Sequence, residues 1–282
     1  MFSRFPVLRL GLTFLALASV ASTPAASVWK VTGPHGGTIY LGGSIHGLDS
    51  TDYPLPSAYN RAFDATSALV IEDDPNVSRR ETDKFFKSGF YSRGDSLKNH
   101  VDPRTYDYVR RVFRTVPEAE LAKCKPWMLI TMLWSGRTNE LGVEAFLMRR
   151  ARANRKPILG LESFREHADV LAGMSDKQAE LVLLDTFAQA AAPGTDRSKN
   201  ILSAWRRGDA DAIARLVNEN AGNLPTFNER LIAQRNRNWI PKIEGYLRER
   251  KTYFVVGGAA HMGGPNGVLA LLKARGCRIE QL

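Results

Sequence analysis

The 282-residue sequence predicts an α/β fold: a mixed, largely buried sheet flanked by helices, with a helical region in the middle of the chain. The first observation behind this prediction is a set of short apolar runs near both ends of the chain, each of strand length. The second is the long intervening stretch, where apolar residues recur at the three- and four-residue spacing of amphipathic helices. Interleaved strands and helices favour a sheet with helices packed on it.

The first half of the chain begins with two strands, 27–32 and 38–44, joined by the turn-rich GPHGG. A helical segment opens at Pro54, and the apolar strand ALVI at 68–71 ends directly in three acidic residues. The remaining predicted segments are helices except for three strands at 156–162, 252–258 and 277–282. The helices are 78–89, 103–115, 125–137, 143–154, 164–174, 175–192, 200–220, 227–239 (bent or ended near Pro241) and 267–276.

Residues 1–26 have the layout of a secretory signal peptide. Arg4 and Arg9 precede an apolar core at 10–18, which is too short to span a bilayer, and small residues follow. We expect cleavage after Ala21 or, preferably, after Ala26. This leaves 27–282 as a single domain without a transmembrane segment, in the periplasm or secreted.

The net charge of +10 falls to +8 without Arg4 and Arg9, because the leader holds no acidic residue. Such a charge would favour association with anionic envelope surfaces. The basic residues are not interleaved with aromatic ones, so no nucleic-acid partner is predicted. Cys124 and Cys277 lie outside any C-x-x-C motif, and the sequence leaves open whether they form a disulfide.

Two strand exits share the pattern G-G-x-x-H, at His46 and at His261, which is consistent with an internal duplication. Glu72 is the first charge after the ALVI strand. Because the carboxyl ends of strands in α/β sheets form ligand sites, these three side chains are candidate ligands of a divalent metal. The alternative is that each is a structural residue at a turn. His35 and His167 are predicted to be surface residues.

These residues, together with KPW at 125–127, LGLES at 159–163 and the Arg235-Asn236 dipeptide, resemble the TraB/GumN family, which is related to the Tiki proteins. The similarity spans nearly the whole mature chain. It implies the fold of erythromycin esterases and of a haem-binding lipoprotein family, and for Tiki-like members a metal-dependent protease activity with manganese or cobalt. The family's usual G-L-E-T reads G-L-E-S here.

The resemblance also implies roles for particular residues. His46, His261 and Glu72 would bind a divalent ion (manganese, cobalt or zinc), and Gly43 and Gly258 would give the ion and substrate room to approach. Glu72 is alternatively the general base. The other residues expected to act in catalysis are Glu162, Arg235 and Asn236. By its chemistry Glu162 would be a base or a residue behind the ligands, and the alternative is that it caps the following helix. The guanidinium of Arg235 would bind a substrate carboxylate or an oxyanion, and the alternative is an ordinary surface salt bridge.

Two hypotheses on function follow. The first is an exported metal-dependent hydrolase that cleaves a peptide or amide bond in a peptide or small-molecule substrate. The second is a non-catalytic periplasmic binding or assembly protein of the same fold, which holds haem, a metal or an envelope component. A test for turnover distinguishes the two.

Overall fold

The computed structural model describes residues 26–136, 138–191, 197–220 and 224–282, so the predicted signal peptide 1–26 lies outside them except for its last residue. The described strands form one sheet in the order β4-β3-β5-β2-β1-β6. Four neighbouring strands, β4, β3, β5 and β2, are parallel, whereas β1 is antiparallel to both β2 and β6. The predicted mixed α/β sheet is therefore confirmed. The strand bounds are Val28–Thr32 (β1), Thr38–Ser44 (β2), Ala68–Ile71 (β3), Ile158–Gly160 (β4), Tyr253–Gly258 (β5) and Arg278–Gln281 (β6).

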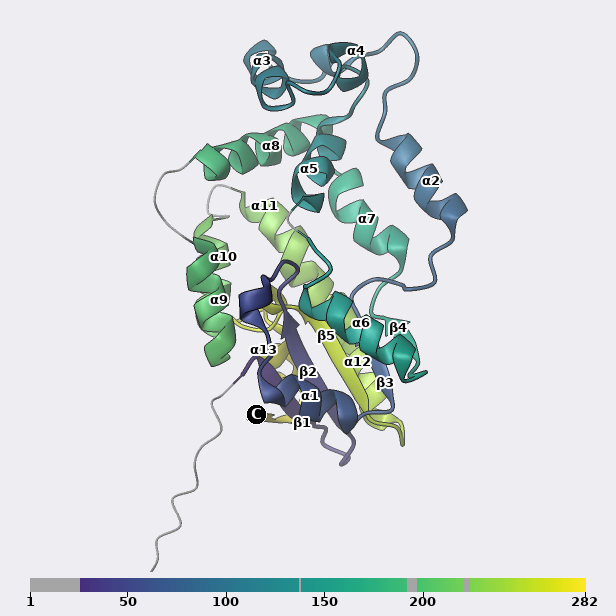
Figure 1. Cartoon of the computed structure of the whole chain (residues 1–282), viewed down its shortest axis with the longest axis vertical. Helices are drawn as coiled ribbons and strands as arrows, with labels where there is room; N and C mark the ends of the chain where they lie inside the picture. Colours follow the sequence, from purple (N-terminus) through teal and green to yellow (C-terminus); the bar gives the residue numbers. More distant parts are fainter. Residues whose placement is uncertain (1–25, 137, 192–196, 221–223) are drawn as a thin grey trace, which may run out of the picture.

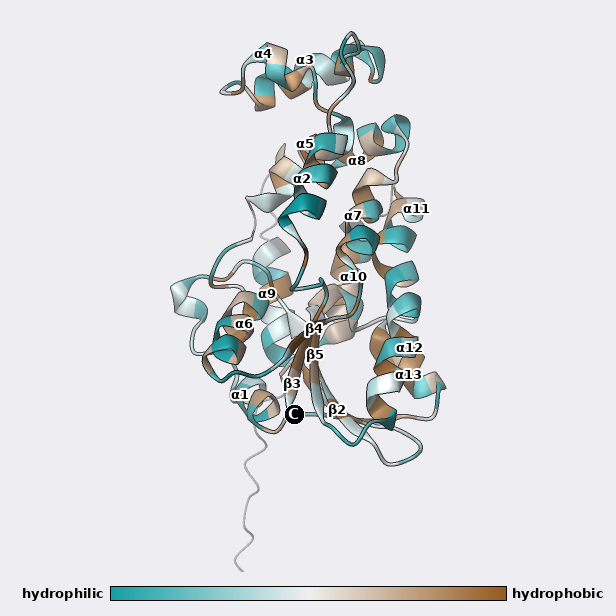
Figure 2. Ribbon diagram, turned by 90° about the vertical axis from the view of Figure 1, so that its right-hand side faces the viewer, coloured by the Kyte–Doolittle hydropathy of each residue, from teal (hydrophilic) through white to brown (hydrophobic). Residues whose placement is uncertain are grey.

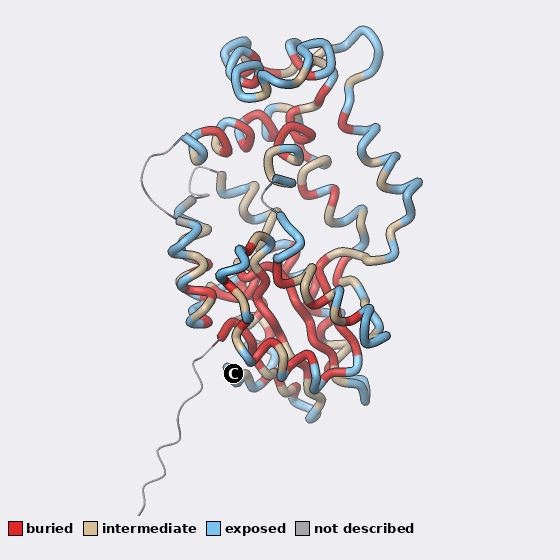
Figure 3. The backbone as a smooth tube through the Cα atoms, in the orientation of Figure 1, coloured by how far each residue is buried: buried red, intermediate tan, exposed pale blue. Residues whose placement is uncertain are grey.

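Helices cover both faces of the sheet, which Figure 2 shows nearly edge-on. Alternation along β3 sends Leu69 and Ile71 to one face and Ala68 and Val70 to the other. Figure 3 shows the buried strands in the lower half of the molecule. The first face packs on α1 (Ser57–Asp64), α6 (Val143–Ala153), α9 (Arg197–Arg207) and α10 (Ala210–Asn220), and the second packs on α12 (Gln234–Arg248) and α13 (Val268–Ala274).

The middle of the chain forms a helical region, as predicted, and this region has its own apolar core. It lies at the upper end of the molecule in Figure 1 and centres on the contact between α5 and α8. Its helices are α2 (Arg79–Ser88), α3 (Pro103–Val112), α4 (Glu118–Leu121), α5 (Pro126–Ser135), α7 (Phe164–Ala172) and α8 (Asp176–Ala191).

The starts of these helices follow from local chemistry. Ser78 and Glu81 form a reciprocal capping box at the start of α2, and Ser163 does the same with Glu166 at the start of α7. At α3, Asp102 accepts a hydrogen bond from the backbone N–H of Arg104.

Two predicted helices differ from the structure. Segment 200–220 forms two helices, α9 and α10, with Gly208 at a positive φ of 67° between them. Segment 227–239 is divided into α11 (Pro225–Asn228), a π-helical segment η3 (Glu229–Ala233) and the first part of α12. The helix neither ends nor breaks near Pro241, because α12 continues to Arg248. Proline removes one backbone donor, but α12 buries Ile243 and Leu247 against the sheet, and this burial outweighs the lost hydrogen bond.

The two G-G-x-x-H segments lie side by side, because β2 and β5 are adjacent and parallel. Their glycine pairs are displaced by one residue, so that Gly43 pairs with Gly257. The histidines consequently leave the sheet at different heights. An internal duplication remains a prediction.

Both cysteines are free and buried, so the disulfide alternative is not realised. Cys124 belongs to the core of the helical region, whereas Cys277 packs with the sheet and α12. Within the described ranges, no helix combines the length and apolar content needed to cross a bilayer.

We expect two free thiols per chain. Alkylation in denaturant without a reductant, followed by intact-mass measurement, should show two adducts, and dithiothreitol should leave the thermal midpoint unchanged, since no covalent loop constrains the unfolded state. A mass two hydrogens lower with no adduct would contradict the arrangement of Cys124 and Cys277 described above.

Candidate functional site at the carboxyl edge of the sheet

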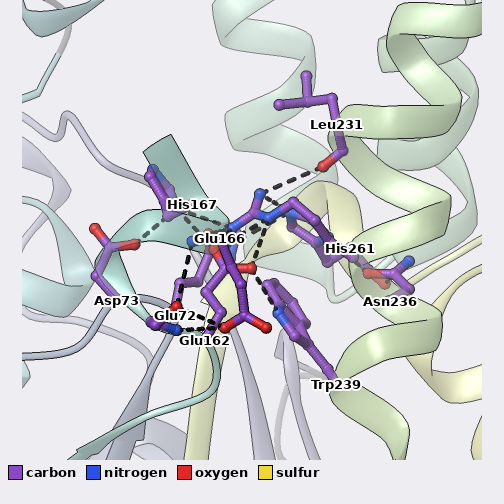
Figure 4. A network of polar contacts seen from close by, with 12 residues as sticks. Glu72, Asp73, Glu162, Glu166, His167, Leu231, Asn236, Trp239 and His261 are labelled. Carbon is purple, nitrogen blue, oxygen red and sulfur yellow. Dashed lines mark hydrogen bonds and ion pairs between the residues drawn. The ribbon is translucent and has the colours of Figure 1, made fainter. Parts of the chain in front are cut away.

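The carboxyl ends of the four parallel strands place ionisable side chains together. His46 follows β2, Glu72 follows β3, Glu162 follows β4 and His261 follows β5, while α12 adds Arg235 from the facing side. Figure 4 shows Glu72, Glu162 and His261 gathered there from separate elements. The proximity follows from topology, since parallel neighbours end at the same edge.

His46, Glu72 and His261 converge on Gly258. A Cβ built on this glycine would lie 3.2 Å from Glu72 Oε1, 3.5 Å from His261 Cδ2 and 3.7 Å from His46 Nε2. The three groups therefore surround one small space that a larger residue would fill. His46 is exposed, whereas Glu72 and His261 are buried.

The tautomer of His261 is fixed by Asn236. The Nδ2 group of Asn236 donates to the carbonyls of His261 and Asn266, at 3.2 and 2.8 Å, so its Oδ1 must accept the 2.6 Å hydrogen bond from His261 Nδ1. The free electron pair of the imidazole is thus on Nε2, which faces Glu72 Oε1 at 3.9 Å. Burial lowers the pKa of His261 to about 4, although Glu72 acts in the opposite direction.

Arg235 lies at the centre of the site, and all five of its N–H groups have partners. Nε–H and one hydrogen of Nη2 reach Glu162 at 3.1 and 2.6 Å, and the other Nη2 hydrogen reaches Glu72 Oε2 at 2.5 Å. Nη1 donates to His261 Nε2 at 3.1 Å and to the carbonyl of Leu231 at 3.3 Å. The predicted role of Arg235 in binding a substrate or oxyanion requires it to give up one of these partners. Arg235 also stacks over Trp239, 4.9 Å from the ring centroid, as their i, i+4 spacing predicts.

Glu72 is held as an anion. Burial by itself would raise its pKa, but the charges that His261, Arg235 and His46 can carry, together with a short hydrogen bond from the N–H of Gly258, hold the pKa below its ordinary range. A buried carboxylate kept ionised in this way is suited to binding a cation or to orienting a proton donor.

His167 is partly exposed, as predicted, but it also contacts the site, which the sequence did not predict. Its Nδ1 lies 2.7 Å from Asp73 Oδ1 and 2.8 Å from Glu162 Oε1. Burial lowers the pKa of His167, but the hydrogen bonds to Asp73 and Glu162 outweigh this and raise it to about 10. The sequence missed His167 because its partners come from other elements. His35 is exposed, as predicted.

Glu162 accepts hydrogen bonds instead of capping the following helix, the role that Ser163 fills. Arg235 and His167 donate to Glu162, and the indole N–H of Trp239 donates to Glu162 Oε2 at 3.1 Å. Burial favours the neutral acid, yet the hydrogen bonds from His167 and Arg235 lower the pKa of Glu162 below its usual value. Glu162 therefore stands behind the strand-end groups and holds Arg235 in place.

Glu144 is a further site residue that sequence reasoning did not identify. Glu144 lies in the first turn of α6, and its side chain accepts a 3.0 Å hydrogen bond from the hydroxyl of Ser44. The start of α6 is held near β2, because the backbone N–H of Val143 donates to the carbonyl of Ile45. Burial and the nearby Glu72 carboxylate raise the pKa of Glu144 to about 8. At neutral pH the protonated Glu144 thus lies near the ionised Glu72, a pairing typical of acid–base chemistry.

Comparison with known proteins identifies the family of the chain. The TraB/PrgY/gumN family model matches residues 27–281. The chain belongs to this family. A protein of Treponema pallidum (strain Nichols), described as uncharacterized, is 24% identical across 92% of this chain and 84% of its own length. No solved structure matches the chain.

The two glycines expected to make room for a cofactor have different surroundings in this TraB/PrgY/gumN family chain. Gly258 adjoins the site, as described above. The missing Cβ of Gly43 points instead to Ala259 and Ser27, at 3.2 and 3.3 Å, and its carbonyl accepts hydrogen bonds from Trp205 and Tyr59. Gly43 thus allows close packing behind the strand.

The donor set fits a divalent ion in its residue types. Two imidazoles and one carboxylate surround the space at Gly258, and His261 has its N–H tied to an amide, as metal-bound histidines commonly do. A second group, Glu72, Glu162 and His167, has donor atoms within 4.8 Å of one another. Among the described residues this second group alone brings three donor atoms within that distance, but the raised pKa of His167 keeps a proton on Nδ1.

The protonated state of Glu144 predicts a pH effect on stability. Between its ordinary pKa of 4.5 and the folded value of about 8, the folded state holds a proton that the unfolded state releases, so stability falls as pH rises through this window. Replacement Glu144→Gln keeps the neutral form. As the pH rises from about 6.5 to 8.5, the unfolding free energy of the parent should therefore fall by on the order of 1–2 kcal/mol more than that of Glu144→Gln.

Urea unfolding at several pH values tests this prediction. The matched control is Glu140→Gln, because the Glu140 side chain is almost fully exposed. Parallel pH profiles for Glu144→Gln and the parent would show that Glu144 is ionised in the folded state.

Proposed function

We propose that this TraB/PrgY/gumN family member is an exported metal-dependent hydrolase that cleaves a peptide or amide bond. The observation that carries the proposal is the convergence of His46 Nε2, Glu72 Oε1 and the His261 ring around Gly258. Export is inferred from the layout of residues 1–26 and would place the enzyme in the periplasm or outside the cell.

In this proposal His46, His261 and Glu72 hold the ion. A bound manganese, cobalt or zinc ion supplies an activated water and polarises the scissile carbonyl. Asn236 keeps the electron pair of His261 on Nε2, and the N–H of Gly258 orients Glu72. Both groups are thereby set before substrate arrives, which lowers the reorganisation that the reaction requires.

Glu144 and Ser44 supply the remaining proton chemistry. Because Glu144 is protonated near neutral pH, it can give a proton to a departing amine, and Ser44 holds its carboxyl in place. Glu72 remains ionised and takes no part in this step as an acid. The two glutamates thus divide the roles of anion and proton donor.

Replacing both histidines should remove the ion without unfolding the chain. We expect near-stoichiometric manganese, cobalt or zinc in the parent after loading, and almost none in His46→Ala, His261→Ala, since two of the three ligands are lost. Elemental mass spectrometry measures the content, and circular dichroism confirms folding. The control His35→Ala removes an exposed imidazole and should retain the ion.

Equal metal content in the parent and the folded double variant would contradict the site. A loaded parent that hydrolyses no member of a broad peptide and ester library would instead favour the binding-protein hypothesis.

A methyl group at Gly258 should disturb the same site more gently. The φ of −49° allows alanine there, but its Cβ would lie 3.2 Å from Glu72 Oε1 and 3.7 Å from His46 Nε2. We expect Gly258→Ala to weaken manganese binding by about tenfold or more, since a misplaced donor costs on the order of 1.4 kcal/mol or more. Isothermal titration measures the affinity.

The control for this variant is Gly245→Ala, because a Cβ there meets no atom within 4 Å and the residue lies inside α12. It should bind manganese as the parent does, with unchanged or slightly higher stability. Identical affinities for Gly258→Ala and the parent would show that the ion does not lie beside Gly258.

A further inference from the structure

The cation at the centre of the described site is the guanidinium of Arg235. It contacts two of the three proposed ligands: Nη2 is 2.5 Å from Glu72 Oε2, and Nη1 is 3.1 Å from His261 Nε2. The latter contact uses the electron pair that a metal ion would need. An ion bound through Glu72 and His261 would also lie close to this positive charge in a buried setting, where like charges repel strongly.

Arg235 is anchored to Glu162 through two nitrogens, Nε at 3.1 Å and Nη2 at 2.6 Å, and Glu162 is itself held by Trp239 and His167. Only the two outer nitrogens, Nη1 and Nη2, reach His261 and Glu72. Because the guanidinium is planar and moves as one body, a tilt that releases Glu72 and His261 also gives up the Nη2 contact with Glu162 and can keep the contact from Nε.

The backbone beneath Arg235 is also unusual. The π-helical segment Glu229–Ala233 precedes it, and the carbonyl of Leu231 in that segment accepts from Nη1 at 3.3 Å. Single π turns are rare in helices and are frequently associated with functional sites. Here the segment supplies the Arg235 side chain with a partner that does not depend on Glu72 or His261.

We propose that Arg235 is a displaceable internal cation that occupies the metal site and must leave Glu72 and His261 before an ion can bind. This inference rests on the proposed metal site. We call the Arg235 guanidinium in this position the plug. Its anchor is Glu162. The measured metal affinity is then the intrinsic affinity reduced by the fraction of molecules in which Arg235 has swung away.

Removing the guanidinium should therefore tighten metal binding, although it removes a residue of the site. If Arg235 is displaced in fewer than about one molecule in ten, Arg235→Met should bind Mn²⁺ at least about tenfold more tightly than the parent. Arg235→Lys keeps the charge but loses the planar fork that engages several partners at once, so its affinity should lie between the two.

The experiment is isothermal titration of each protein with Mn²⁺, using chain expressed from the full sequence and purified without chelators. The matched control is Arg230→Met, which removes the same charge from the π segment that precedes Arg235. Arg230 donates to the carbonyls of Asp169 and Gly173 and to none of the proposed ligands in the described contacts. Its affinity for Mn²⁺ should equal that of the parent.

The outcomes separate this inference from the proposed function. If the parent binds Mn²⁺ and Arg235→Met binds equally or more weakly, the plug is wrong while the metal site stands. If neither binds, both the metal site and the plug are wrong. If circular dichroism shows that Arg235→Met does not fold, Arg235→Lys decides: tighter binding than the parent supports the plug, and an equal or weaker affinity overturns it.

Discussion

The ion pairs of Arg235 with Glu72 and Glu162 are the interaction on which the site depends. The two carboxylates follow different strands, β3 and β4, and all three side chains are buried. Leaving a buried charge without its partner typically costs about 3–5 kcal/mol. The position of α12 on the sheet and the position of the strand ends are therefore fixed by the same contacts, and neither can shift without exposing a charge to the apolar interior.

The direction of the strands provides the other constraint. Because β2, β5, β3 and β4 run in parallel, residues that are 215 positions apart, such as His46 and His261, leave the sheet at one edge. The glycines at these exits allow backbone and side chain to approach. At Gly258 the lack of a Cβ leaves room for three side chains, while its N–H binds Glu72. The local sequence and the topology thus act on the same few atoms.

The sequence predicted more of the fold than of the contacts within the site. Apolar runs and glycine exits were enough to locate β2, β3 and β5, because strand periodicity is a local property. The place of His167 depends on Asp73 and Glu162, which reach it from other elements, and no spacing along the chain reveals that. Glu144 was missed for the same reason, since it appears from sequence as an ordinary charge in the first turn of a helix.

The length of α12 shows the limit of local rules in the other direction. Pro241 is a strong signal for the end of a helix, yet the apolar face that continues to Leu247 packs against the sheet and keeps the helix intact. Propensity is decided locally, whereas burial is decided by the whole chain. The same helix could therefore carry both Arg235 and the residues that fasten it to the core.

Burial is the first cause of the shifted pKa values at this edge. The cations Arg235 and His167 already face the anions Glu72 and Glu162, and burial disfavours any further charge: His261, with a pKa of about 4, and Glu144, with a pKa of about 8, are both neutral near pH 7. A site with this property resists the addition of charge but tolerates the exchange of one cation for another. Displacement of the guanidinium from Glu72 would be such an exchange. A metal ion would enter the space at Gly258 as the guanidinium leaves, so the net charge of the site would change least.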